Sequence, residues 1–348
     1  MYLYFVSKRE QISTISLLSS ILLTLSVIGI LLTFSPTSKA QATLEEMDWA
    51  YAISPAFPAE EDDGTLHSLP GSEGRFTLTQ ARNRFGPADW YPQDHLPMPS
   101  IVEIGRESAG IMACSLCHYP SGQGKPENAS VVALEPEYFV QQMQDMRDGL
   151  RSSANTAKAN TFNMIAFAVN MTDEEIDQAA EYYGAMNWDQ WIEVVETDTV
   201  PLTYLRGGLH IPFEGDEAGE EPIGSRIIEM PVNPEDTELW RNPRSGFRAL
   251  VPVGAVSAGE ALATTGADKT ITCSVCHGEQ LQGLGFVPPI RGRSPSYLAR
   301  QLFDFQQGTR DGAWSPLMNA VVEKLTGDDI INLTAYLASL PIEQQENP

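Results

Sequence analysis

Apolar side chains recur at the spacing of an α-helix in five stretches of the chain. Two of these stretches begin with a serine or threonine that precedes a glutamate by three residues, and two others have a proline in the first turn. Both features mark helix starts. The sequence therefore predicts a mainly α-helical fold, with helices over 136–151, 172–187, 257–265, 294–308 and 326–340.

Two long stretches lack this helical period. Residues 43–105 are rich in proline and acidic residues, and we expect an irregular N-terminal arm there. Residues 188–250 form a long linker between the helical regions. The linker contains two runs typical of short β-strands, 191–196 and 226–230.

All four cysteines fall in two pentapeptides of the form C-x-x-C-H, at 114–118 and 273–277. Two thiols one helical turn apart can add to the two vinyl groups on one edge of a porphyrin. The imidazole that follows can then face the iron, so this pattern is typical of c-type haem attachment. It predicts two covalently attached haem c groups. The attachment cysteines are Cys114, Cys117, Cys273 and Cys276, and the proximal histidines that bind the irons are His118 and His277.

Other uses of paired cysteines fit this sequence less well. The pairs of a zinc ribbon are ~15 to 20 residues apart, whereas Cys273 follows Cys114 by 159 positions, with a histidine after each pair. A thioredoxin-like site needs a βαβ context, which neither motif has. A disulfide between the pairs would leave both trailing histidines without a role.

The surroundings of the two motifs form an internal repeat. A shift of 159 positions aligns the motifs and a following helix, including Tyr138 with Tyr297 and Arg151 with Arg310. The first copy then carries five extra residues, after which a shift of 154 aligns Thr172 with Thr326. The chain is therefore a duplicated domain.

The same shift of 154 places Met164 opposite Met318. A methionine thioether across from a histidine gives an iron suited to electron transfer. The sequence thus predicts Met164 and Met318 as the distal ligands, the latter on a loop at 315–318. Methionine is also common as core filler, and Met143, Met146 and Met171 are neighbours in the first copy that align with core-type residues in the second.

The formal net charge of −24 argues against nucleic-acid binding and favours redox partners with basic faces. Near the N-terminus, Lys8 and Arg9 precede an apolar run at 12–34 and then small residues. We interpret 1–42 as an export signal, or as an anchor in the inner membrane through 12–34. Either interpretation predicts a periplasmic protein.

With these residues in hand, the chain resembles the class I cytochromes c, and especially the di-haem cytochrome c-four group of electron carriers. The resemblance implies two tandem cytochrome c domains at 106–187 and 251–348, each a small helical bundle around one haem. It also implies that the carbonyl of Pro288 orients the proximal imidazole of the second domain. The first copy has Ala129 at that position, so the resemblance predicts weaker support for His118.

The leading functional hypothesis is an electron carrier, not an enzyme, that takes electrons from a quinol-oxidising complex or dehydrogenase and passes them to a terminal oxidase or reductase. A cytochrome c subunit of a larger oxidoreductase is one alternative. A di-haem cytochrome c peroxidase is another, but it needs an iron with a displaceable ligand. The histidines outside the motifs, His67, His95 and His210, all fall outside the predicted haem domains.

Overall fold

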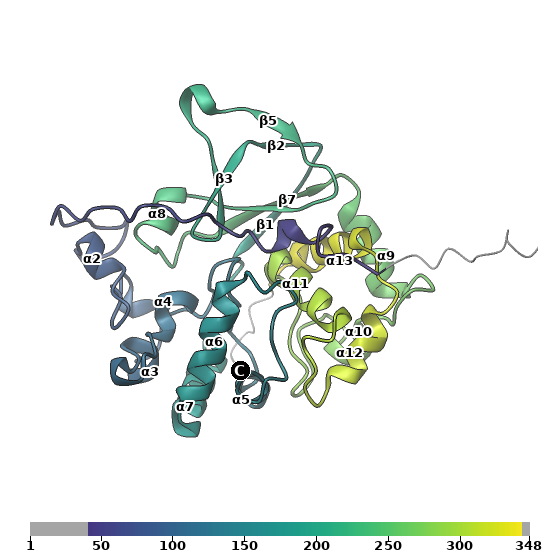
Figure 1. Ribbon diagram of the computed structural model, residues 1–348, viewed down its shortest axis with the longest axis horizontal. Coiled ribbons are helices and arrows are strands. Elements are labelled where there is room, and N and C mark those ends of the chain that lie inside the picture. The colour runs from purple at the N-terminus through teal and green to yellow at the C-terminus, as the bar shows by residue number, and fades with distance from the viewer. Residues whose placement is uncertain (1–40, 343–348) are drawn as a thin grey trace, which may run out of the picture. The chain divides into compact units, whose positions relative to one another are not determined.

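The computed structural model describes residues 41–342 (Figure 1). The export signal or anchor predicted for 1–42 lies almost entirely outside this range. Among the residues described, no helix has the length and apolar character needed to cross a membrane. The fold is mainly α-helical with small sheets, as predicted.

The first copy of the repeat is built from α4, α5, α6 and α7. Their bounds are Cys114–His118, Pro136–Arg147, Ala159–Asn170 and Asp173–Gly184. Thr172 and Glu175 form the predicted capping box: the threonine hydroxyl accepts from the Glu175 amide, and the glutamate accepts from the Thr172 amide. Helix α6 was not predicted. Apolar side chains of α5, α6 and α7 pack into one core.

The second copy contains five helices, α9 to α13. Their bounds are Ala255–Thr265, Ser274–His277, Pro295–Gln306, Ser315–Val322 and Gly327–Ser339. The capping box predicted at Ser257 is wrong, because α9 begins earlier. Its N-cap is Gly254, whose φ of 86° favours glycine, and the hydroxyl of Ser257 donates back to the Gly254 carbonyl.

The linker forms three small sheets. Strands β1 (Ile192–Thr197) and β7 (Phe247–Pro252) pair in parallel, and β6 (Ile228–Pro231) pairs antiparallel with β7. The two runs predicted as strands, 191–196 and 226–230, correspond to β1 and β6. The remaining elements are a β3–β4 hairpin, a β2–β5 pair and the short helix α8, with bounds Thr203–Arg206, Leu209–Pro212, Thr199–Pro201, Glu220–Pro222 and Pro234–Glu238.

The sheet and the N-terminal arm both pack against the helical regions (Figure 1). Apolar residues of β1 and β7 share a core with Ile331 and Ala335 of α13. The arm contains the short helices α2 (Leu78–Ala81) and α3 (Ser100–Glu103). Met47 and Tyr51 at its start are fully buried in the core of the second copy. The arm therefore adds to the core of the second copy.

Candidate haem sites

The first C-x-x-C-H motif forms the short helix α4 at the wall of a cavity. Cys114, Cys117 and His118 all line this cavity. The His118 Nδ1–H donates to the carbonyl oxygen of Ala129 at 2.8 Å, which leaves Nε2 available to bind a metal. Burial lowers the pKa of His118, so the imidazole is neutral and its Nε2 lone pair is unprotonated.

The second motif repeats this geometry. The His277 Nδ1–H donates to the carbonyl oxygen of Pro288, also at 2.8 Å. Weaker support for His118 was predicted because Ala129 replaces proline, and that prediction is wrong. The accepting group is a backbone carbonyl, which every residue type has, so alanine provides it equally well.

Burial affects the first cysteine of each motif in the same way. Burial raises the pKa of Cys114 to about 12 and that of Cys273 to about 11, so both thiols are protonated at neutral pH. All four cysteines are unpaired. Within residues 41–342, no three His, Cys, Asp or Glu side chains lie close enough together to hold a metal ion.

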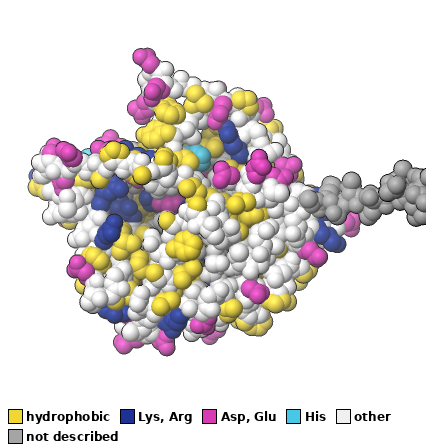
Figure 2. All heavy atoms as spheres, in the orientation of Figure 1, with side chains coloured by type: hydrophobic (Ala, Val, Ile, Leu, Met, Phe, Trp, Pro, Cys, Tyr) yellow, Lys and Arg dark blue, Asp and Glu magenta, His cyan; other side chains and the backbone are white. Residues whose placement is uncertain are grey.

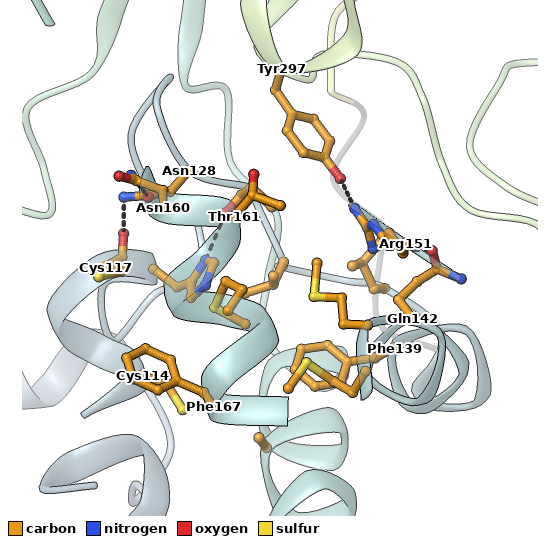
Figure 3. A pocket seen from close by; sticks show the side chains of 18 of the residues that line it. Cys114, Cys117, Asn128, Phe139, Gln142, Arg151, Asn160, Thr161, Phe167 and Tyr297 are labelled. Atoms are coloured by element: carbon orange, nitrogen blue, oxygen red, sulfur yellow. Dashed lines mark hydrogen bonds between the residues drawn. The ribbon is translucent and has the colours of Figure 1, made fainter. Parts of the chain in front are cut away.

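The first cavity changes character from one end to the other. Phe167 lies beside Cys114, Asn128 and Asn160 lie beside Cys117, and Arg151 and Tyr297 lie at the opposite end (Figure 3). A haem has the same polarity, with vinyl groups on one edge and two carboxylates on the other. The residues present therefore fit a haem attached at Cys114 and Cys117.

Met164 of α6 lines the first cavity and is half-buried. Met143, Met146 and Met171 line it too, and Met143 and Met171 are buried in the surrounding core. The structure thus places the predicted ligand in the same cavity as His118. Met164 lies on helix α6, which the apolar pattern of the sequence around it did not predict.

Met318 is the one methionine between residues 251 and 342. It is half-buried and packs against the same core as Cys273. The prediction that it lies on a loop is wrong, because it belongs to helix α12 (Ser315–Val322). Pro316 suggested a loop, but a proline in the first turn of a helix sacrifices no intrahelical hydrogen bond.

The two copies meet at a junction where equivalent residues exchange contacts. Arg151 donates to the hydroxyl of Tyr297 at 3.2 Å and to Gln301 Oε1 at 3.0 Å. In return, Arg310 donates to the Tyr138 hydroxyl and to Gln142 Oε1, both at 2.7 Å. Two backbone hydrogen bonds of 2.7 Å, Ser152 N–H to Thr309 O and Asp311 N–H to Leu150 O, complete this junction. The repeat predicted the residues but not their pairing.

The three remaining histidines do not line the first cavity. His67 stacks on Trp240, with ring centroids 4.0 Å apart, and His95 contacts Asp89. His210 lies in β4, where burial lowers its pKa to about 4. All three make local contacts in the arm and the linker.

Comparison with known proteins places these features in a family. No protein-family model matches the chain. Cytochrome c-554(548) of Halomonas halodenitrificans is 37% identical over 83 residues, which is 24% of this chain and 98% of that protein. The thiosulfate dehydrogenase electron acceptor of Stutzerimonas stutzeri is 22% identical, over 69% of this chain and 84% of that protein. Cytochrome c4 of Pseudomonas aeruginosa is 24% identical, over 68% and 87%.

The first of these relatives is matched over nearly its whole length, and the other two are matched over most of both chains. Together with the two attachment motifs and the cavity lined by Cys114, Cys117 and His118, these matches establish the family. The chain belongs to the c-type cytochromes, as a di-haem protein similar to cytochrome c4 with two covalently attached haem c groups.

Proposed function

We propose that this protein is a periplasmic electron carrier whose two irons are ligated by His118 with Met164 and by His277 with Met318. The observation that carries the proposal is the first cavity, where both cysteines, His118 and Met164 face one space. A thioether opposite an imidazole leaves the iron no open position for a substrate. The repeat extends the same ligand set to the second copy.

When bound, each haem supplies a one-electron Fe(III)/Fe(II) couple. The carbonyls of Ala129 and Pro288 fix the orientation of the imidazoles. Buried apolar residues of α5 to α7 exclude water from the first site.

The second motif is the more accessible place for electrons to enter or leave. Ser274, Val275 and Cys276 are all exposed, whereas Ser115 and Leu116 are buried. We place partner docking at the second motif for this reason. Electrons then pass between the copies across the junction of Arg151 and Arg310.

The donor proposed here is a dehydrogenase in the same exported compartment. One relative is itself described as a thiosulfate dehydrogenase electron acceptor. The net charge of −24 favours a partner with a basic face. Both acidic and basic side chains appear in several separate places on the face in Figure 2. Association should therefore slow as the salt concentration rises.

Visible spectroscopy of the purified holoprotein tests this function. We expect two haems per chain, both low-spin in the oxidised and reduced forms, and no spectral change when carbon monoxide is added to the reduced protein. Carbon monoxide binding at either haem would overturn the proposal. It would favour a peroxidase-type site with an iron that opens.

A further inference from the structure

The two haem sites share most of their charged groups. Arg151 and Arg310 are equivalent in the repeat, and so are the buried carboxylates Asp145 and Asp304. The two arginines are expected to contribute equally to the two irons, whereas Asp304 lines the first cavity and Asp145 does not. An excess of positive charge at one site must then come from cations that only one copy has.

Arg300 is such a charge, because the residue equivalent to it in the first copy is the neutral Gln141. Arg300 belongs to α11 of the second copy, yet it lines the first cavity. It is 5% exposed and donates to the carbonyl oxygens of Ala50 at 2.6 Å and Pro126 at 2.7 Å. Within residues 41–342 it forms no salt bridge with a carboxylate.

Lys158 is a second unmatched cation. It also lines the first cavity, is 5% exposed, and donates its Nζ–H to the Tyr51 carbonyl at 3.0 Å. The part of the chain that the structure describes gives it no carboxylate partner within salt-bridge distance. The shift of 154 that aligns Met164 with Met318 places Gly312 at this position, so the second copy has no cation there.

The acids near these cations leave the excess positive charge in place. Glu127 lines the cavity but pairs with Lys125 at 2.9 Å. Glu229 interacts with Arg300, but burial raises the pKa of Glu229, and its carboxylate already accepts from Ser294 at 2.8 Å. Asp304 lines the cavity as well, but Arg151, Arg300 and Arg310 all interact with this one carboxylate. Positive groups at the first site therefore outnumber the carboxylates that could neutralise them.

The second copy has its own buried arginines. Arg291 aligns with Val132 of the first copy and donates to the Pro341 carbonyl. Arg293 aligns with Leu134, but its guanidinium reaches into the first copy and donates to Val132 O at 2.9 Å. Neither lines the first cavity. Arg291 is thus a buried arginine of the second copy that lies outside the first cavity.

A positive charge near an iron favours the reduced state, because reduction adds one negative charge. We propose that Lys158 and Arg300 raise the reduction potential of the first haem above that of the second. Electrons that enter at the exposed second motif then come to rest on the first haem. This inference rests on the proposed carrier function and adds a direction to it.

Redox titration of the holoprotein tests the inference. The two haems are followed separately by NMR, and the first is identified by contacts of its methyl protons with Phe139, which lines its cavity. In the wild type, we expect the first haem to be reduced at the higher potential. Arg300→Gln introduces the residue type found at the equivalent position, Gln141. It should lower the reduction potential of the first haem by about 59 mV, which is a tenfold change in the equilibrium constant for its one-electron reduction. Lys158→Gln should lower it in the same direction.

Matched variants separate charge from structural damage. Arg300→Lys keeps the charge and should keep the potential of the first haem close to that of the wild type. Arg291→Gln, which removes a buried arginine that does not line the first cavity, should leave the potential of the first haem unchanged. The inference is overturned if the first haem has the lower potential in the wild type, or if Arg300→Gln and Lys158→Gln both leave its potential unchanged. Two low-spin haems with the opposite order would leave the carrier function standing.

Discussion

The two attachment helices carry the same ligands in different surroundings. Leu116 in α4 is 9% exposed, whereas Val275, at the equivalent position in α10, is 66% exposed. The histidines do not differ in this way, since His118 and His277 are each 8% exposed. Duplication has thus preserved the orientation of the imidazole while the outer face of each motif diverged.

The difference comes from segments outside the repeat. Helix α3 of the arm packs beside α4, and Ile101 and Val102 of α3 are buried in the core of the first copy. The linker sheet packs on α13 of the second copy instead. The arm therefore covers the first motif, and nothing in the described chain covers the outer face of the second to the same degree. In the proposed carrier, the second attachment motif is therefore the place where a partner can approach a haem most closely.

The largest effect is expected when one proposed distal ligand is replaced, because the two haem sites then differ in the coordination of their irons. Met164→Ala and Met318→Ala should each open one iron, so that one haem per chain binds carbon monoxide. Carbon monoxide difference spectra measure this directly. Met143→Leu, which changes a buried methionine of the same cavity, should bind none. If Met164→Ala stays closed while Met171→Ala opens, the ligand of the first haem is Met171.

The junction is the next place where the copies depend on each other. Arg151→Met should leave the Tyr297 hydroxyl and Gln301 without a donor and lower the free energy of unfolding by roughly 2 to 4 kcal/mol. Arg310→Met should have a similar effect. Denaturant titration measures both, with Arg248→Met, an exposed arginine, as a control expected to change by less than about 0.5 kcal/mol.

The double variant sharpens this test. Arg151 and Arg310 share Gln142 and Gln301 as acceptors, so their effects should not be additive. A simple sum of the two single effects would show that the reciprocal contacts act independently.

Most of the haem chemistry could be predicted from the sequence, because it depends on local patterns. The C-x-x-C-H motif is a contiguous signal, and the repeat aligned Met164 with Met318 without any knowledge of the fold. Helix starts at Thr172 and Ser294 were predicted correctly, since their caps act within three residues.

The remaining features depend on contacts that are distant along the chain. Helix α6 was missed because many of its apolar residues face the cavity or solvent rather than a core stripe. The placement of Arg300 in the first cavity was missed for a similar reason. The pattern of apolar and polar residues along α11 does not indicate which copy of the repeat its polar side chains contact. Only the packing of the two copies shows it.

A smaller effect on stability is expected at Pro288, whose pyrrolidine ring is absent at the equivalent Ala129 of the first copy. Pro288→Ala keeps the carbonyl that accepts from His277, so the low-spin spectrum should be unchanged. The stability should fall by less than about 1 kcal/mol, because alanine gives the unfolded chain more freedom than proline does. Thermal unfolding and visible spectra check the two outcomes. A loss of the low-spin spectrum would mean that the proline ring itself positions the imidazole.

The last and smallest difference concerns the dependence of the two potentials on pH. Burial, followed by the neighbouring charge of Arg300, lowers the pKa of Lys158 to about 7; Glu127 acts in the opposite direction, and Lys125 lowers it slightly further. Reduction of the first haem adds negative charge nearby and raises this pKa, so the reduced form binds more protons. The potential of the first haem should therefore fall as the pH rises above about 7, by at most about 59 mV per pH unit. In Lys158→Gln the slope should disappear over this range while that of the second haem stays unchanged. An unaltered slope in the variant would assign the proton to another group, such as a haem carboxylate.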